Sequence, residues 1–335
     1  MFESHGFRED LRRFGPKSES GGVDSGTATP PDAEHAPPTA EQAQAYCRSL
    51  TTRHYENFTV ASWLLPRRYR QDVCNLYAYC RWSDDLADET GSPGESLALL
   101  FWWRSQLEDV FRGKARHPVF VALAETLSRH ELPQQPFRDL LDAFERDQHQ
   151  TRYATVGDLM SYCSGSANPV GRLYLHLTDQ ASSENLAFSD SICTGLQWAN
   201  FCQDVARDQA RGRIYLPRET WAACGYTDED FAERRCNDAF RSLLRTEVDR
   251  ADRFLRNGWP LVEGISSEIR VPIELFVRGG LAILQRIRDE GYDVWSRRTV
   301  LSRTAKLQLA LAALGKAQLA AWQSRRASHR GPHER

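Results

Sequence analysis

Oxygen-bearing side chains recur at four-residue steps in two stretches of the chain, and this spacing constrains the fold more than any other feature. The first stretch places Asp84 and Asp88 four residues apart, and the second repeats Asn200, Asp204 and Asp208 at the same step. Residues four apart share one face of an α-helix. Aromatic and other apolar residues stand between them. Each stretch is therefore predicted to form a partly buried helix with one face rich in oxygen ligands.

The rest of the chain carries the same helical periodicity. Apolar residues recur at three- and four-residue intervals, while alternating strand patterns and hairpin signals are scarce. The chain is therefore predicted to have an all-α fold, built as a single domain around a central cavity. Helices are expected over residues 69–89, 95–112, 118–129, 135–148, 156–163, 170–178, 188–207, 228–257, 273–290 and 304–324.

The two ends of the chain differ from its middle. Residues 14–38 are rich in Ser, Gly, Pro and Thr and nearly free of large apolar side chains. Such a segment cannot bury enough surface to offset the entropy of ordering, so we expect residues 1–38 to be a disordered tail. The helical domain is expected over 39–324, beginning at Thr39, an N-cap residue with Gln42 three positions later as in a capping box. Residues 325–335 form a basic C-terminal tail.

Composition argues against several classes of protein. The 43 Lys and Arg residues nearly balance 45 Asp and Glu residues, for a net charge of -2, which gives no global reason to expect a nucleic acid as a partner. None of the eight cysteines forms a C-x-x-C pair, which argues against zinc-finger and thioredoxin-like sites. A secretory signal and an apolar run of about 18 residues are both lacking. We therefore expect a cytoplasmic protein with reduced thiols.

The two oxygen-rich faces suit magnesium. Proteins hold Mg²⁺ through one or two carboxylates, with water and substrate phosphate at its other positions. Two such faces, opposed across a helical cavity, would clamp a diphosphate through bridging ions and stabilise the charge that it gains as a leaving group. A di-iron bundle, the main rival, needs the step Glu-x-x-His, which occurs nowhere in the chain. We therefore expect Mg²⁺-dependent ionisation of an allylic or cyclopropylcarbinyl diphosphate.

Several motifs resemble those of the squalene/phytoene synthase family. Besides the two acidic stretches, the matching motifs are Leu64-Leu65-Pro66 and the run from Gly212 to Pro217. The resemblance spans residues 54–307 and implies a class-I isoprenoid synthase fold, Mg²⁺ as cofactor and a prenyl diphosphate as substrate. Similarity to the hopanoid-pathway hydroxysqualene synthase branch is found at residues 56–58, 166–172 and 200–204. The implied reaction converts presqualene diphosphate and water to hydroxysqualene and diphosphate.

The resemblance also implies roles for individual residues. The ligands of a Mg²⁺–diphosphate cluster would be Asp84, Asp85, Asp88, Asn200, Asp204 and Asp208. Direct contacts with the diphosphate would come from Arg81, Arg213 and Arg297. Hydroxyl groups near the leaving group would come from Tyr77 and Tyr215. Further contacts with the substrate would come from Asn57 and Gln203.

Two of these positions depart from the pattern of the enzymes that couple two prenyl diphosphates head to head. Those enzymes usually carry Ser and Arg where this chain has Asn57 and Gln203. A neutral Gln lacks the charge and the rigid fork of Arg, so the pocket would hold one cation fewer. This favours turnover of preformed presqualene diphosphate, with water as the terminating nucleophile.

Three alternatives stay open. One is a prenyltransferase of the same class that makes presqualene diphosphate, squalene or phytoene from farnesyl or geranylgeranyl diphosphate. The others are a more distant class-I terpene cyclase and a non-catalytic scaffold of the family, for which eroded acidic motifs would be expected. A basic C-terminal end and lipid substrates are compatible with peripheral attachment to the inner face of a membrane. The substrate chain length, the terminating step and the oligomeric state are not determined by the sequence.

Overall fold

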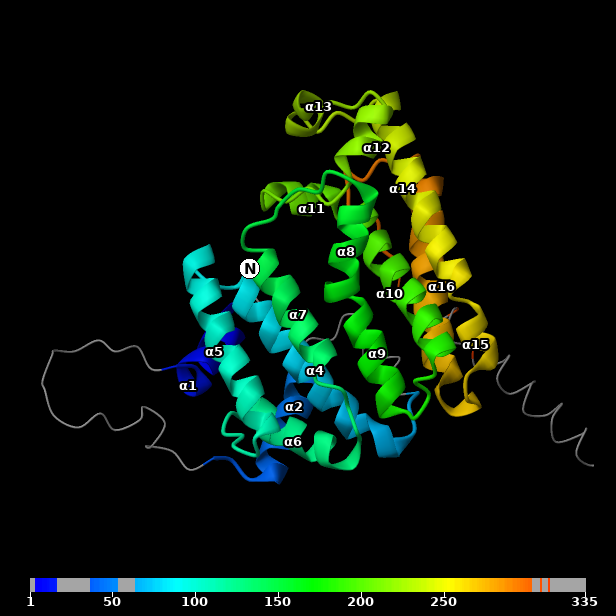
Figure 1. Cartoon of the computed structure of the whole chain (residues 1–335). Coiled ribbons are helices and arrows are strands. Elements are labelled where there is room, and N and C mark those ends of the chain that lie inside the picture. Colours follow the sequence, from blue (N-terminus) through cyan, green and yellow to red (C-terminus); the bar gives the residue numbers. More distant parts are fainter. Residues whose placement is uncertain (1–3, 17–36, 54–63, 303–307, 309–312, 314–335) are drawn as a thin grey trace, which may run out of the picture. The chain divides into compact units, whose positions relative to one another are not determined.

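The computed structural model describes residues 4–16, 37–53, 64–302, 308 and 313. Within these residues every regular element is a helix, and the only β contact is an isolated bridge between Arg152 and Ile214. The all-α prediction is therefore confirmed (Figure 1). In this part of the chain, no helix combines the length and the apolar character that crossing a bilayer requires.

The helices belong to two compact units, one formed by residues 1–59 and 67–150 and the other by residues 60–66 and 151–335. The first unit contains α1 (Ser4–Phe14), α2 (Ala40–Arg53), α4 (Arg67–Asp88), α5 (Pro93–Phe111), α6 (Pro118–Arg129) and α7 (Gln135–Arg146). The second unit contains α8 (Val156–Ser166), α9 (Asn168–Leu177), α10 (Ser183–Gln203), α11 (Val205–Ala210), α12 (Arg218–Ala223), α13 (Asp228–Ala232), α14 (Asp238–Asn257), α15 (Pro260–Gly264) and α16 (Ser267–Asp289).

Most of these helices lie where the apolar periodicity predicts them, and α6 has the predicted bounds. The expected helix over 228–257 is divided into α13 and α14, because Asn237 accepts a hydrogen bond from the Phe240 N–H and so begins a new helix. The expected helix over 188–207 is also divided, at Asp204. The short helices α12 and α15 are not predicted. Asn57, the tail after residue 324 and most of the expected helix over 304–324 lie outside the described residues.

The start of α2 agrees with the predicted capping box. The Thr39 N–H donates to Gln42 Oε1 at 3.0 Å, and the Gln42 N–H donates to Thr39 Oγ1 at 3.3 Å. Both bonds satisfy backbone donors that the first turn of a helix leaves without intrahelical partners. The predicted capping box of Thr39 and Gln42 is therefore confirmed at the start of α2.

The N-terminal helix α1 corrects the expectation of a disordered tail for residues 4–14. Its Phe7 side chain is buried, with the ring 5.4 Å from that of Trp82, and the Phe14 ring lies 5.2 Å from that of Tyr46. Asp10 accepts a hydrogen bond from the Tyr46 hydroxyl at 3.0 Å. Two aromatic side chains therefore give this short segment enough apolar surface to pack on α2 and α4.

Helix α4 is the centre of the first unit, in contact with α2, α5, α6 and α7. Its inward face carries Tyr79 and Trp82, both fully buried, and Trp82 stacks on Trp103 with ring centres 5.2 Å apart. The buried Tyr79 hydroxyl donates to the Phe137 carbonyl at 2.7 Å. The burial of one face of α4 leaves the acidic stretch on its other side.

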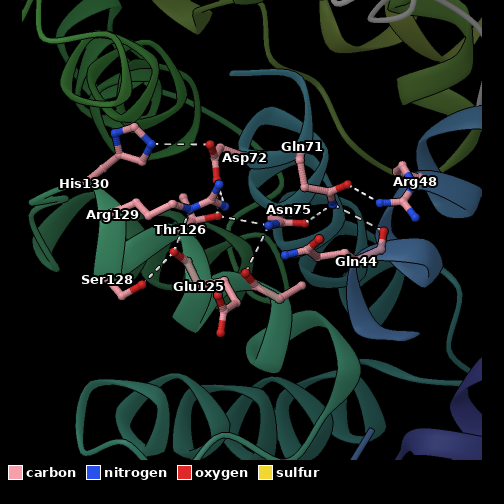
Figure 2. A network of polar contacts seen from close by, with 11 residues as sticks. Gln44, Arg48, Gln71, Asp72, Asn75, Glu125, Thr126, Ser128, Arg129 and His130 are labelled. Atoms are coloured by element: carbon pink, nitrogen blue, oxygen red, sulfur yellow. Dashed lines mark hydrogen bonds and ion pairs between the residues drawn. The ribbon is translucent and has the colours of Figure 1, made fainter. Parts of the chain in front are cut away.

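A buried polar network also ties α4 to α6 (Figure 2). The Asp72 carboxylate is fully buried and accepts hydrogen bonds from Thr126 at 2.9 Å and from Arg129 at 2.6 Å, with His130 Nε2 at 3.3 Å. One turn later, Asn75 donates to Thr126 at 2.9 Å. Directional bonds of this kind, unlike apolar contacts, fix how α4 is rotated about its axis.

Helix α10 is the centre of the second unit, in contact with α8, α9, α14 and α16 (Figure 1). Glycines allow two of its neighbours to approach closely. A Cβ atom on Gly195 would lie 2.9 Å from the backbone nitrogen of Leu255 on α14. A Cβ atom on Gly171 of α9 would lie 2.4 Å from Ser189 Oγ and 2.6 Å from Cys193 Sγ. Any larger residue at these positions would push the helices apart.

Candidate active site

The first acidic face lies on the last two turns of α4. Arg81 binds Asp85 through two hydrogen bonds, from Nε at 3.0 Å and from Nη2 at 2.5 Å. Its Nη1 atom lies 3.5 Å from Asp84 Oδ2, whose side chain is 48% exposed. Asp88 is exposed at the end of the helix. Asp84 and Asp88 thus present carboxylates outward, as their four-residue spacing predicts, while Asp85 does not.

Burial shifts the pKa of two side chains beside this face, Asp85 and Tyr77. It raises the pKa of Asp85 to about 7, and the Arg81 guanidinium acts in the opposite direction. Asp85 is therefore the internal partner of Arg81 in this structure. Its predicted role beside the metal, and the predicted contact of Arg81 with diphosphate, stay predictions. Burial likewise raises the pKa of Tyr77 to about 12, so its hydroxyl stays a proton donor at neutral pH.

The second acidic face spans the junction between α10 and α11. Asp204 stands at this junction with φ -104° and ψ 14°, outside regular helical geometry. The four-residue bonding nevertheless continues through it, since its N–H donates to the Asn200 carbonyl at 2.8 Å and the Asp208 N–H donates to the Asp204 carbonyl at 2.9 Å. Asn200, Asp204 and Asp208 therefore keep their predicted spacing although the helix is interrupted.

A segment far along the chain supplies the cation for this face. Arg298 donates to both carboxylate oxygens of Asp204, from Nε at 2.5 Å and from Nη2 at 2.9 Å. Burial and the neighbouring Asp204 raise the pKa of Asp208 to about 7, and Arg211 and Arg213 oppose this. A carboxyl group whose pKa is raised in this way is shifted back toward its charged form by a nearby positive charge.

Gln203 helps to hold that segment in place. Its buried side-chain amide donates a short hydrogen bond to the Thr299 carbonyl, and the Thr299 hydroxyl donates to Glu290 at 2.7 Å. Glu290 also pairs with Arg297 at 3.2 Å, and the Arg297 side chain is 67% exposed. Arg298 therefore contacts the acidic face through Asp204, whereas Arg297 pairs with Glu290, and the predicted contact of Arg297 with diphosphate stays a prediction. The sequence offers two adjacent arginines and no signal that separates them.

The predicted residues after α11 lie beside this face. Gly212 adopts a φ of +78°, which favours glycine, and the Arg213 N–H that follows donates to the Asp208 carbonyl at 2.9 Å. The Tyr215 ring stacks on Phe201 of α10, with ring centres 4.2 Å apart. The sequence prediction that Arg213 and Tyr215 accompany the second acidic stretch is consistent with these contacts.

The donor chemistry of both faces fits magnesium. Among the described residues, no three His, Cys, Asp or Glu side chains gather into a group that would hold a metal by itself. Mg²⁺ does not require such a cage, because one or two carboxylates suffice when phosphate and water complete its coordination. Asp84 with Asp88, and Asn200 with Asp208, are oxygen donors of this kind.

Named relatives resemble the chain over most of its length. The sequence profile described as squalene/phytoene synthase matches residues 51–305. The phytoene synthase of Arthrospira platensis is 30% identical over 284 residues, which is 81% of this chain and 92% of that protein. The 15-cis-phytoene synthase of Synechococcus elongatus is 30% identical over 282 residues, which is 80% of this chain and 92% of that protein.

Solved structures agree with this relationship. The squalene synthase HpnC from Alicyclobacillus acidocaldarius matches with a TM-score of 0.73 and 40% identity, over 76% of this chain and 95% of that one. A dehydrosqualene synthase in complex with ligand matches with a TM-score of 0.76 and 25% identity, over 83% of this chain and 98% of that one. The fold and the paired acidic motifs thus define an enzyme of the helical isoprenoid synthase class. Within that class, the chain belongs to the squalene/phytoene synthase family.

Proposed function

We propose that the chain is a hydroxysqualene synthase, which converts presqualene diphosphate and water to hydroxysqualene and diphosphate. The observation that carries the proposal is Gln203, a neutral residue at the second acidic face whose amide is committed to the Thr299 carbonyl. An arginine there would add a cation for a second diphosphate, whereas Gln203 adds none. The 40% identity to squalene synthase HpnC supports the same branch of the family.

Both acidic faces would bind the one diphosphate of this substrate. Bound Mg²⁺ would supply positive charge to the leaving oxygens. We propose that it is held by Asp84, Asp88, Asn200, Asp204 and Asp208, with Asp85 in support through Arg81. Because the carboxylates come from two separate helices, loss of either face would remove part of the charge compensation.

The residues around the second face would stabilise the departing diphosphate. Arg298 donates to both carboxylate oxygens of Asp204, and the Arg213 backbone N–H donates to the Asp208 carbonyl. The guanidinium groups of these two arginines can donate paired hydrogen bonds to phosphate oxygens. The hydroxyls of Tyr77 and Tyr215 would donate to the same group. Arg297, which pairs with Glu290, is replaced by Arg298 in this proposal.

The reaction then balances with water alone. The bond between the cyclopropylcarbinyl carbon and the diphosphate oxygen breaks, and its electron pair leaves with diphosphate. The cation rearranges by ring opening. A water oxygen forms the new carbon–oxygen bond, and the proton that it loses passes to the released diphosphate or to solvent. Stacked rings such as Phe201 and Tyr215 offer π-faces that favour a cation.

A second candidate has its own support. The relatives from Arthrospira platensis and Synechococcus elongatus are phytoene synthases at 30% identity, which favours the head-to-head coupling of two prenyl diphosphates. In that case the neutral Gln203 would have no bearing on substrate choice. The two candidates differ in whether a single prenyl diphosphate such as farnesyl diphosphate is consumed.

Turnover with separate substrates distinguishes the candidates. The enzyme is incubated with Mg²⁺ and no reductant, in separate reactions with presqualene diphosphate, farnesyl diphosphate and geranylgeranyl diphosphate, and products are identified by mass spectrometry. We expect hydroxysqualene from presqualene diphosphate and no consumption of the other two substrates. Consumption of farnesyl or geranylgeranyl diphosphate would instead establish a coupling synthase and overturn the proposal.

A further inference from the structure

The back of α10 carries a buried carboxylate contact. Trp198 is fully buried, and its indole N–H donates to Glu247 Oε2 of α14 at 2.8 Å. Arg250, one turn further along α14, donates from Nε to the same oxygen at 3.2 Å, and its guanidinium carbon lies 5.8 Å from the centre of the Trp198 ring. Glu247 is itself fully buried. Three side chains thus join α10 and α14 through one carboxylate oxygen.

This arrangement costs more than packing requires. Burying a carboxylate is unfavourable unless it is fully paired, and apolar residues of similar size often stabilise a core better. The second oxygen, Glu247 Oε1, has no hydrogen-bond partner among the described residues. The close approach of α10 and α14 is already provided by Gly195 against Leu255. The contact therefore fixes the rotation of α10 about its axis and does not give the most stable packing.

By fixing this rotation, the contact between Trp198 and Glu247 also fixes the orientation of the second acidic face. Successive residues of an α-helix are separated by about 100°, so Asn200 lies about 200° around α10 from Trp198. Asp204 follows one turn after Asn200. Because Trp198 and Asn200 lie on opposite sides of the same short piece of helix, any rotation or sliding of α10 that breaks the indole bond also moves the oxygen ligands.

We propose that Glu247, together with Arg250, is a positioning residue that acts through Trp198 to set the orientation of Asn200 and Asp204. The inference rests on the proposed function, since it concerns the same Mg²⁺–diphosphate binding face. It assigns a role to a carboxylate that does not touch the substrate.

The test is the binding of inorganic pyrophosphate in the presence of Mg²⁺, measured by calorimetry on the full chain, with thermal unfolding measured in parallel. Trp198→Phe removes the N–H and keeps an aromatic ring, and we expect binding to weaken about tenfold, the value of a hydrogen bond to a charged group. Trp221→Phe is the matched control. Its indole N–H is also buried in the second unit and has no hydrogen-bond partner among the residues described, so binding should not change.

Two further variants separate positioning from stability. Glu247→Gln keeps an oxygen acceptor for the indole and should bind pyrophosphate within about threefold of wild type. The double variant Trp198→Phe/Glu247→Leu removes both buried polar groups, should fold at least as stably as Trp198→Phe, and should still bind about tenfold more weakly than wild type.

Two results of these binding measurements would overturn the positioning role. Wild-type binding in the folded Trp198→Phe protein, or in the double variant if the single variant does not fold, would overturn the positioning role even if the melting temperature falls. If wild-type protein itself does not bind Mg²⁺ and pyrophosphate, the proposed function fails and this inference falls with it.

Discussion

The two acidic helices compensate their carboxylates in different ways. On α4 the cation comes from the same helix, since Arg81 stands four residues before Asp85 and binds both of its oxygens. On the second face Arg207 of α11 lies 4.0 Å from Asp204, but the two-oxygen contact comes from Arg298, which is 94 residues from Asp204 in sequence and reaches it from the segment after α16. The first face is therefore self-contained, whereas the second depends on the placement of a distant segment.

The buried polar contacts of α4 and α10 also differ in which helix supplies the carboxylate. Helix α4 contributes its own buried carboxylate, Asp72, to a network with Thr126 and Arg129 of α6 (Figure 2). Helix α10 contributes an indole donor, Trp198, and the carboxylate belongs to Glu247 on α14. Each acidic helix thus has a buried polar contact that fixes its rotation. A change at either contact should therefore alter the orientation of the oxygen ligands on that helix.

The largest effect is expected from the ligand that depends on the distant cation. Asp204→Ala should lower turnover of presqualene diphosphate by about three orders of magnitude, because it removes a proposed ligand of a metal that would supply several kcal/mol of charge stabilisation. Helical content by circular dichroism should not change. Asp228→Ala is the control, since that exposed carboxylate pairs with Arg152 and Arg218, each at 3.1 Å, in the same unit. Turnover of Asp204→Ala at the wild-type rate would contradict the proposed mechanism.

The anchor of the first face comes next. Asp72→Asn should lower the free energy of unfolding by about 3 kcal/mol, because it removes the charge from a fully buried carboxylate bonded to Arg129. Asp142→Asn breaks the ion pair between Asp142 and Arg104. Because the Asp142 side chain is 57% exposed, this variant should lower the free energy of unfolding by less than about 1 kcal/mol. Urea denaturation of both variants provides the measurement. Equal losses would mean that the Asp72 network does not anchor α4.

A buried histidine should make the first unit sensitive to acid. Burial lowers the pKa of His117 to about 3, against about 6.5 in the unfolded chain. The unfolded state therefore binds more protons between pH 6.5 and pH 3, and stability falls as the pH decreases through this window and is constant above it. The loss from this residue between pH 7 and pH 5 should be about 2 kcal/mol.

His117→Asn is the matched variant for this effect. His117 Nδ1 accepts the Val119 N–H at 3.2 Å as the N-cap of α6, and an Asn oxygen can take the same bond without titrating. Denaturation at pH 7 and pH 5 should show a smaller pH effect in the variant than in wild type. Parallel losses in the two proteins would show that another group is responsible.

The smallest effect concerns the two adjacent arginines. Arg298→Gln should weaken Mg²⁺-dependent pyrophosphate binding about tenfold, since a charge-assisted bidentate contact at the second face is lost. Arg297→Gln should change binding less than about twofold, because Arg297 pairs with Glu290 and is mostly exposed. The opposite order of effects would return the role to Arg297, as the sequence alone predicts.

The features that the sequence predicts well are those determined by neighbours in the chain. The capping box of Thr39 and Gln42 and the four-residue steps of both acidic faces are local patterns, and the structure contains them. Local spacing is enough because helical geometry alone brings these groups together.

Other features depend on contacts that no local pattern contains. Helix α1 is stabilised by Phe7 and Phe14 against α2 and α4, so composition alone misjudges it. The interruption at Asp204 coincides with its bond to Arg298, and Gln203 is bound by Thr299. Each of these contacts joins residues far apart in sequence, which is why the first face could be described in advance more completely than the second.

The central claim is that both faces bind one diphosphate through Mg²⁺. Titration calorimetry with inorganic pyrophosphate tests it most directly, with wild-type protein, Asp88→Asn in the first face and Asp208→Asn in the second. The account predicts that wild type binds only when Mg²⁺ is present, and that each variant weakens binding by about tenfold or more. Wild-type affinity in either folded variant would show that its face does not take part, and would contradict a single diphosphate site shared by both.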